Sequence, residues 1–504
     1  MAANPLPEAP MSEQFDVVVV GGGNAGHSAA LAAAERGRRV VLLEKGRRGE
    51  HGGNSFYTAG AMRVAHHGLD DLRDLLDDDE RLASTVLPPY PAETYVHDME
   101  RVTGGRNDDA LTETLVRESM PTLRWLHGQG LRFRLMFERQ AYRSDAGEQV
   151  FWGGLAVGST GGGKGLIEQH EQAARDAGVQ VRYGCAATDL LTEDGAVVGV
   201  RVSSDTPSDD GSDGATTELR AESVILAAGG FEANAAMREQ HLGEGWQRAK
   251  VRGTPLNTGE MLRAAIDIGA QPFGDWSTCH SVAWDVAAQD EGDRELTNQY
   301  TRGGYPLGIM VNSDGQRFVD EGADYRNYTY AKYGAAILRQ PGGVAYQLFD
   351  ATTRRMLRAE DYDHPAVSVV SAPSMEKLAA DLGIDAAALI ETVAAFNASI
   401  DPSVPFDAAV KDGRSADVEP PKSNWALPLE TPPFFAFPVT CGITFTFGGL
   451  RADPEGRVLT ESGAALPGLF VCGEMLGGLF SGNYPGGTGL VSGAVFGRRA
   501  GGLA

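Results

Sequence analysis

The sequence predicts an α/β protein in which a domain built on a parallel sheet receives an inserted α+β domain. Three observations favour this fold class. A strand, a glycine turn, a helix and a second strand follow one another within residues 15–44. Two more apolar segments, 224–230 and 468–474, have a glycine at or next to their last residue although they lie far apart in the chain. Between about 245 and 440 the regular alternation of strands and helices is lost, as expected for a second domain.

The length of the chain fits several domains, and its composition is that of a globular protein. At roughly 100–200 residues per domain, 504 residues allow more than one. Hydrophobic residues make up 42% and charged residues 22%, which are ordinary values. We expect a flexible N-terminal tail (1–14), a first part of the sheet domain (15–244), an inserted capping and substrate domain (245–440) and a C-terminal part of the sheet domain (441–504).

Charge and motif content exclude several classes of function. The formal net charge is −24, which disfavours binding to nucleic acid or to an anionic membrane surface. No apolar run reaches the roughly 18 residues of a membrane-spanning helix, and the first residues lack the basic and apolar parts of a signal peptide. Histidines and cysteines show no metal-ligand spacing. We therefore expect a cytoplasmic protein with reduced thiols, no bound metal, and local basic charge at any anion site.

The first element is a dinucleotide-binding unit. Residues 15–20 predict a strand, and 27–36 an alanine-rich helix that leads to a second strand at 39–43. The turn before the helix is rich in glycine, and an acid, Glu44, follows the second strand. Such a turn brings its backbone close to a pyrophosphate at the helix N-terminus, and the acid accepts hydrogen bonds from ribose hydroxyls. The context predicts a Rossmann-like site, to which we assign the turn residues Gly21, Gly23, Asn24, Ala25 and Gly26.

Further elements complete the sheet domain. They are expected, in order, at 166–177 (helix), 179–183, 196–203 and 223–228 (strands), 469–474 (strand) and 490–500 (helix). The polar loop 204–217 has the composition of a solvated hairpin insert rather than of a domain linker.

The other glycine-rich segments identify the dinucleotide as FAD. Residues 51–60 follow the second strand directly, where a flavoprotein passes its chain under the ring system, and 224–231 ends beside the first turn. The helix that begins near 488 would aim its N-terminus at the flavin C2 carbonyl and stabilise the charge that develops there on reduction. No second glycine fingerprint indicates a bound NAD(P)H. The further residues assigned to FAD are Glu44, Lys45, Gly53, Asn54, Ser55, Thr58, Gly60, Ala187, Ala228, Gly229, Glu474, Thr488, Gly489 and Leu490.

Together these segments resemble the flavoprotein subunits of fumarate reductase and succinate dehydrogenase over about residues 15–504. Within that family, the strings at 52–55, 320–330, 441–449 and 483–489 look most like those of tricarballylate dehydrogenases. The resemblance implies an FAD enzyme that oxidises tricarballylate to cis-aconitate by removing a hydride and a proton from adjacent carbons. Because the chain carries no haem, iron–sulfur or second dinucleotide motif, an external electron acceptor, a separate membrane partner or dioxygen must take the electrons.

The resemblance also predicts how FAD is attached. In the membrane-bound succinate dehydrogenases, a histidine in the segment that corresponds to 51–60 carries FAD covalently. Here that position falls on Asn54. We therefore expect noncovalent FAD.

Two neighbouring residues are candidates for the proton-transfer group. The fumarate reductases that this chain resembles use an arginine four residues beyond an Arg-Phe-x-x-Glu motif as proton donor. The motif is present at 317–321, but the offset lands on Tyr325, with Arg326 next. We favour Arg326, because the most similar family keeps arginine at this position.

The resemblance assigns further residues to the substrate. His280 matches a histidine that binds a substrate carboxylate in fumarate reductases, a second such histidine falls near Thr444, and an arginine of the last glycine turn falls on Tyr484. A glutamate–arginine relay behind the proton donor falls on Gln299 and Arg302. Because several of these groups are replaced, we expect oxidation of a saturated acid to be faster than reduction of fumarate.

Three other functions stay open. Tyr325 and Tyr484 resemble the paired tyrosines of 3-ketosteroid Δ1-dehydrogenases, of which one takes the proton and the other polarises the ketone. The remaining alternatives are a fumarate or enoate reductase and a non-catalytic flavin-binding electron carrier. The basic candidates above, and the four arginines between residues 132 and 143, favour an anionic substrate over a steroid.

Overall fold

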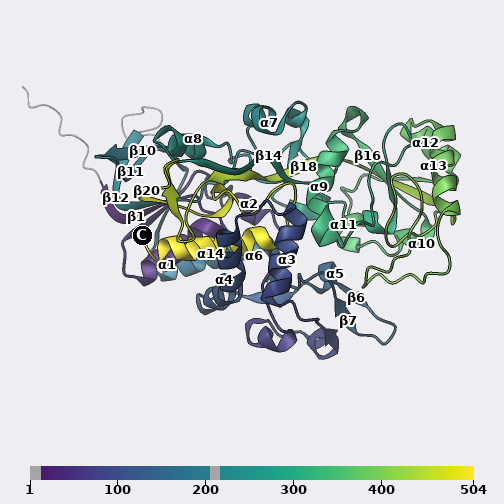
Figure 1. Cartoon of the computed structure of the whole chain (residues 1–504), viewed down its shortest axis with the longest axis horizontal. Helices are drawn as coiled ribbons and strands as arrows, with labels where there is room; N and C mark the ends of the chain where they lie inside the picture. Colours follow the sequence, from purple (N-terminus) through teal and green to yellow (C-terminus); the bar gives the residue numbers. More distant parts are fainter. Residues whose placement is uncertain (1–12, 205–215) are drawn as a thin grey trace, which may run out of the picture.

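The computed structural model describes residues 13–204 and 216–504, and it confirms the α/β class (Figure 1). An 8-stranded sheet lies towards one end of the molecule, and the helices α12 (Met375–Leu382) and α13 (Ala386–Ala398) lie at the other. Residues 1–12 of the expected N-terminal tail lie outside the described residues. The first strand begins at Glu13.

The 8-stranded sheet has a parallel centre. Its order is β10-β11-β12-β1-β2-β9, with β20 paired to β12 and β19 to β20. Strand β1 pairs in parallel with β2 and β12, whereas β10, β11 and β12 pair antiparallel. Val17, Val18 and Val19 of β1 are fully buried, as in a parallel sheet covered on both faces. The strands are β1 (Glu13–Val20), β2 (Val40–Glu44), β9 (Gln180–Tyr183), β10 (Cys185–Glu193), β11 (Ala196–Ser204), β12 (Thr216–Leu226), β19 (Arg457–Leu459) and β20 (Ala465–Val471).

Helices α1 (Asn24–Glu35) and α14 (Thr488–Gly501) pack against each other beside this sheet (Figure 1). A Cβ atom at Gly497 would lie 2.4 Å from the carbonyl oxygen of Ala25, and one at Gly501 would lie 2.0 Å from that of Ala29. The missing side chains let the two helices approach closely. Since the contacts follow the same order along both helices, their N-termini face the same side of the sheet.

Most predicted elements of this domain are present, and two strands, β10 and the three-residue β19, were missed. Strand β10, sequence CAATDLLTE, lies at the edge of the sheet with many of its residues exposed. It therefore lacks the apolar pattern that marks a central strand. The predicted insert 204–217 joins the antiparallel strands β11 and β12, and its residues 205–215 lie outside the described part of the chain.

A 6-stranded sheet forms the core of the second unit. Its order is β13-β18-β16-β15, and β14 and β17 also pair with β18. All pairs except β13 with β18 are antiparallel. Strand β18 runs through the expected domain boundary at 440/441, so this sheet continues to Leu450. The strands are β13 (Lys250–Val251), β14 (Pro272–Asp285), β15 (Ile309–Val311), β16 (Ala345–Phe349), β17 (Val370–Ala372) and β18 (Phe434–Leu450).

The remaining elements surround these two sheets. Two small sheets contain β3 (Ala61–Met62), β4 (Thr85–Val86), β5 (Phe133–Leu135), β6 (Ala141–Arg143), β7 (Gln149–Phe151) and β8 (Val157–Ser159). The other helices are α2 (Gly53–Phe56), α3 (Ala92–Thr103), α4 (Asp109–Gly128), α5 (Phe137–Gln140), α6 (Gly162–Asp176), α7 (Ala235–Leu242), α8 (Glu260–Asp267), α9 (Arg326–Leu338), α10 (Ala351–Arg354) and α11 (Ala359–Tyr362). Within 13–204 and 216–504, no helix has the length and hydropathy needed to cross a bilayer.

Candidate active site

One cavity is lined by residues from both large sheets. On the side of the 8-stranded sheet, its wall includes the carboxyl ends of β1 and β2 and the turn after β12. On the other side it includes residues of β14, β18 and the start of α9. Ligands of open parallel sheets bind at the carboxyl ends of the strands. The cavity therefore joins a dinucleotide site to a second compartment.

The first glycine turn forms a cradle at the N-terminus of α1. Gly21 has a φ of +110°, and a Cβ atom there would lie 2.2 Å from the carbonyl oxygen of Ala227. One at Gly26 would lie 1.9 Å from the carbonyl oxygen of Gly21, so Gly26 allows the turn to close and does not line the cavity. The N-cap residue of α1, Gly23, has no side chain to cap the helix, which leaves backbone N–H groups for an anion. The turn residues that line the cavity are Gly21, Gly23, Asn24 and Ala25.

Glu44 ends β2 and is buried beside the cavity. Its Oε1 accepts a hydrogen bond from Gly46 N at 2.6 Å, and its Oε2 accepts one from Gly52 N at 3.3 Å. Burial raises the pKa of Glu44, and these backbone donors oppose the shift. The neighbouring Lys45 donates to Glu260 Oε1 at 3.0 Å. Glu44 thus holds the following loop in place while it presents a carboxyl group where ribose hydroxyls are expected.

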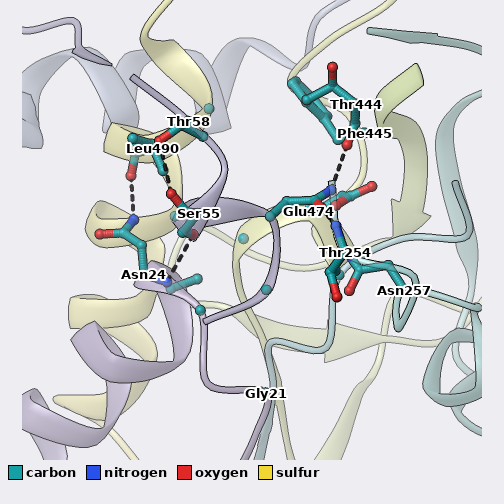
Figure 2. A pocket seen from close by; sticks show the side chains of 18 of the residues that line it. Gly21, Asn24, Ser55, Thr58, Thr254, Asn257, Thr444, Phe445, Glu474 and Leu490 are labelled. Carbon is teal, nitrogen blue, oxygen red and sulfur yellow. Dashed lines mark hydrogen bonds between the residues drawn. The ribbon is translucent and has the colours of Figure 1, made fainter. Parts of the chain in front are cut away.

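Helix α2 and the start of α14 meet at Asn24 (Figure 2). Asn24 N donates to Ser55 Oγ at 3.1 Å, and Asn24 Nδ2 donates to Leu490 O at 2.8 Å. The N-cap of α14 is Gly487, and no side chain caps this helix either. Two uncapped helix N-termini therefore border one cavity, and each favours negative charge.

Most residues assigned to FAD line the cavity, and three do not. Besides the turn, the lining residues are Glu44, Lys45, Gly53, Asn54, Ser55, Thr58, Ala187, Ala228, Gly229, Glu474, Gly489 and Leu490. Gly26, Gly60 and Thr488 lie behind the wall. A Cβ atom at Gly60 would lie 2.9 Å from Gly162 C, and the Thr488 hydroxyl accepts a hydrogen bond from Tyr95 Oη at 3.1 Å. Uncapped helix ends, close glycine backbone and a buried acid together fit a flavin dinucleotide.

The side chain of Asn54 is fully engaged within the protein. Asn54 Nδ2 donates to Glu232 Oε1 at 2.6 Å and to Thr444 O at 2.5 Å, and Asn54 Oδ1 accepts from Thr254 N at 2.8 Å. An amide nitrogen is also a poor nucleophile, so this position offers no group for a covalent link.

We predict that acid precipitation releases all of the flavin from the protein. Yellow colour should move entirely to the supernatant, because Asn54 stands where the tethering histidine would be. The measurement is the flavin absorbance of the supernatant and of the redissolved pellet. Colour that stays with washed pellet would contradict noncovalent binding.

Two carboxyl groups lie together at the edge of the cavity. Glu232 is inaccessible to solvent and its Oε2 has no hydrogen-bond partner, whereas Glu474 is half-buried on the cavity wall. Thr446 N donates to Glu474 Oε1 at 2.8 Å. Burial raises the pKa of both groups, and the negative charge of Glu232 raises the pKa of Glu474 further. We expect the pair to retain one proton at pH values where an exposed glutamate has already lost its own, because two close like charges disfavour each other.

This pair predicts a loss of stability with rising pH. Above 4.5, the ordinary glutamate value, the unfolded chain loses a proton that the folded chain keeps. The free energy of unfolding should therefore fall by up to about 1.4 kcal/mol per pH unit until the raised pKa is passed. Glu232→Gln should flatten this slope, whereas Glu461→Gln at an exposed position should not. Urea unfolding at several pH values measures the slope, and equal slopes in wild type and Glu232→Gln would contradict the shared proton.

The structure separates the two candidates for proton transfer. Arg326 lines the cavity, and its Nη2 donates to Arg139 O at 2.7 Å. Tyr325 is the residue before α9 and does not line the cavity. Its ring stacks on Trp152 at 5.3 Å between centroids, and its hydroxyl donates to Ala409 O at 3.4 Å. Of these two residues, only Arg326 lines this cavity.

His280 and two tyrosines form a polar corner of the cavity. Both ring nitrogens of His280 are buried without a hydrogen-bond partner, and burial together with Arg252 holds the pKa of His280 well below its ordinary value. The His280 ring lies 4.9 Å from the rings of Tyr330 and Tyr484, measured between centroids. The hydroxyls of Tyr330 and Tyr484 are hydrogen-bonded to each other. Tyr484 thus pairs with Tyr330, and the predicted pairing of Tyr484 with Tyr325 is not present.

Two residues assigned to the substrate lie outside the cavity. Arg302 is fully buried, and its Nη2 pairs with Asp285 Oδ2 at 2.7 Å. Its Nη1 donates to the backbone carbonyl groups of Gln299 and Asp361, at 2.8 and 2.6 Å. Neither Arg302 nor Gln299 lines the cavity, so the structure contradicts their expected contact with substrate. Thr444 does line it.

Sequence reasoning missed three residues of this compartment. Arg252, Arg139 and Tyr330 all line the cavity. Arg139 is one of the four arginines between residues 132 and 143, whose location relative to the site could not be predicted from the sequence. Its Nη2 pairs with Asp361 Oδ1 at 3.1 Å. Tyr330 lies one helical turn after Arg326 on α9, so helical spacing could have indicated that both face the same side.

Known proteins of similar sequence and structure are oxidoreductases. The fumarate reductase (cytochrome) of Shewanella frigidimarina is 29% identical over 97% of this chain and 76% of its own length. The 3-oxosteroid 1-dehydrogenase of Mycolicibacterium smegmatis is 25% identical over 96% of this chain and 95% of its own. The open conformation of a flavocytochrome c3 fumarate reductase matches with a TM-score of 0.69 at 26% identity, covering 97% of this chain and 78% of that one.

The fold, the cavity and these relatives define an FAD-dependent oxidoreductase that acts on CH–CH groups. The chain belongs to the family described as FAD binding domain, whose model matches residues 16–491. The predicted cofactor, FAD, and the similarity to fumarate reductase flavoproteins are confirmed. The finer similarity to tricarballylate dehydrogenases rests on the sequence strings alone.

Proposed function

We propose that this protein dehydrogenates a carbon–carbon bond next to a carboxylate, and that its substrate is tricarballylate, which it converts to cis-aconitate. The observation that carries this proposal is Arg326. It lies on the cavity wall, and no carboxylate among the described residues pairs with it. A guanidinium group held away from water without a counter-ion favours an anionic ligand.

Arg326 is placed to take the proton in this reaction. Two C–H bonds of the substrate break and one carbon–carbon double bond forms. Bound FAD supplies the acceptor for the hydride from one carbon. The proton of the other carbon, which its carboxylate makes acidic, goes to a nitrogen of Arg326 in its neutral guanidine form. The guanidinium that results is stabilised by the carboxylates of the bound substrate. Burial and the nearby charge of Arg139 lower the pKa of Arg326, which makes the guanidine a better base than it is in water.

A second function is favoured by the tyrosine pair. In a 3-ketosteroid Δ1-dehydrogenase one tyrosine would take the proton and another would polarise the ketone, and Tyr330 and Tyr484 are hydrogen-bonded on the cavity wall. However, burial raises the pKa of both phenols, well above the ordinary value for Tyr484. Burial therefore disfavours the phenolate that such a reaction needs.

Anaerobic titration of the holoenzyme distinguishes the two functions. Tricarballylate should bleach the flavin absorbance, because it donates a hydride, whereas 3-ketosteroids should leave the absorbance unchanged. An external acceptor dye or dioxygen should then restore the colour. If a 3-ketosteroid bleaches the flavin and no di- or tricarboxylate does, the second function is correct and the tyrosine pair carries the reaction. If neither class of compound bleaches the flavin, the result supports an electron carrier.

We also expect the enzyme to favour oxidation. Tyr484 and Thr444 stand where fumarate reductases, by the resemblance, hold substrate carboxylates with charged or basic groups. Dye-linked reduction of fumarate should therefore be slower than dye-linked oxidation of tricarballylate at equal enzyme concentration. Faster fumarate reduction would reverse the proposed direction.

A further inference from the structure

Arg252 is a second arginine on the cavity wall that lacks an acidic partner. It follows β13 directly, and 9% of the residue is exposed. Its Nε donates to Thr301 Oγ1 at 3.2 Å and its Nη1 donates to Thr444 Oγ1 at 2.9 Å. Both partners are neutral hydroxyls. Throughout 13–204 and 216–504, no carboxylate lies within ion-pair distance of Arg252, and its Nη2 makes no hydrogen bond.

This arrangement is unfavourable without a ligand. Burial lowers the pKa of Arg252, which shows that its environment disfavours the charged form. The chain as a whole carries a charge of −24, so acidic partners are abundant elsewhere. Other buried arginines have found them, as Arg302 has with Asp285 and Arg317 with Glu321. An anion that enters the cavity would supply the missing counter-charge.

Arg252 acts on three other residues of this compartment. It donates to the Thr444 hydroxyl, and its charge acts on the phenol of Tyr484 and the imidazole of His280. These three residues come from β18, the last glycine turn and β14, so one arginine from the loop after β13 supplies positive charge to side chains from three other segments.

The groups around Arg252 complete a carboxylate site. A threonine hydroxyl that accepts a hydrogen bond from arginine still has its own hydrogen to donate. Thr301, Thr444 and His280 all line the cavity next to Arg252, and both nitrogens of His280 are without a partner. The free Nη2, two hydroxyl hydrogens and one imidazole N–H together match the four or so lone-pair directions of a carboxylate.

We propose that Arg252, supported by Thr301 and Thr444, binds a substrate carboxylate distinct from the one next to the carbon that Arg326 deprotonates. This inference rests on the proposed function and deepens it. With one guanidinium group for each of two carboxylates, the cavity selects polycarboxylates over monocarboxylates and ketones. Arg252 is therefore a specificity-determining residue.

The test compares Arg252→Gln and Arg252→Lys with Arg248→Gln, which removes an exposed arginine four residues away. Binding of tricarballylate to the oxidised holoenzyme is followed by the perturbation of the flavin spectrum, and turnover is measured with an acceptor dye. Arg252→Gln should raise the Kd and the KM by about 10- to 100-fold, the range of a charged hydrogen bond, with a smaller effect on kcat. Arg252→Lys should recover part of the loss, and Arg248→Gln should match wild type.

Salt provides an independent readout. Rising ionic strength should raise the KM of wild type, because a buried cation attracts the substrate anion, and this dependence should weaken in Arg252→Gln. Kd values that match wild type in Arg252→Gln would overturn the inference while the proposed function stands. Loss of FAD or of folding in both Arg252 variants would assign Arg252 a structural role and also overturn it.

The binding arm separates this inference from the proposed function. If wild type binds tricarballylate but is not reduced by it, the proposed reaction fails and the Kd of Arg252→Gln still decides the role of Arg252. If wild type binds neither tricarballylate nor succinate, both proposals fail.

Discussion

Replacing Arg326 with glutamine should lower the kcat of the proposed tricarballylate oxidation by about 10²- to 10⁴-fold, the usual effect of losing a proton-transfer group. The FAD content stays unchanged, because Arg326 contacts the second compartment rather than the dinucleotide cradle. Glutamine is two bonds shorter than arginine and gives up the hydrogen bond that Arg326 Nη2 makes to Arg139 O at 2.7 Å, so folding and FAD content are measured in the same variant. Stopped-flow measurement of flavin reduction gives the rate of the chemical step directly.

Tyr325→Phe is the matched control for this experiment. Tyr325 packs between Trp152 and Trp425, and the hydrogen bond that its hydroxyl donates to Ala409 O is 3.4 Å long. Removing the hydroxyl should therefore leave flavin reduction close to the wild-type rate. If Tyr325→Phe lost more activity than Arg326→Gln, the assignment of the proton-transfer group would be wrong.

Replacing Arg302 with methionine lowers the free energy of unfolding by about 3–5 kcal/mol, the usual cost of leaving one partner of a buried ion pair alone. Arg302 and Asp285 are both inaccessible to solvent, and the Nη2–Oδ2 distance is 2.7 Å. Asp285 also accepts hydrogen bonds from Ser368 N and Ala287 N, so its carboxylate is held in place after the arginine is lost. Urea unfolding of the holoenzyme measures the change.

The Arg302 experiment also distinguishes the structural role from the one that the sequence predicted. In the soluble fraction that retains FAD, Arg302→Met should bind tricarballylate with a Kd near that of wild type. Arg302→Met combined with Asp285→Asn should recover part of the stability, because no buried charge then remains unpaired. A large rise in the Kd for tricarballylate with little loss of stability would show that Arg302 binds substrate, as the sequence predicted.

The dinucleotide half of the protein could be predicted well because its signals are local. The apolar run of β1, the glycines after it and Glu44 lie within one stretch of chain, and each residue type has a direct steric or hydrogen-bonding reason. Even there, the sequence could not separate glycines that face the ligand, such as Gly23, from those that allow the turn to close, such as Gly26. Strand β10 escaped prediction because an exposed edge strand needs no apolar pattern.

The substrate half could be predicted only in part. His280, Thr444, Tyr484 and Arg326 were placed in the cavity by resemblance to known motifs, and all four line it. The assignments that failed, Arg302 and Gln299, were also made by position in a motif, and the structure shows that an arginine in such a position can turn inward to a buried acid.

The sequence by itself determined the family, the cofactor and the general reaction, since these depend on short segments whose chemistry is complete within a few residues. The tertiary structure alone decided which arginines are available to a substrate. Whether a buried guanidinium is neutralised depends on what neighbouring strands and helices bring against it. Arg302 meets Asp285 at the end of β14, whereas Arg252 meets only the hydroxyls of Thr301 and Thr444. An unpaired buried charge is costly, and this is why we propose that the arginines left without acids bind an anion.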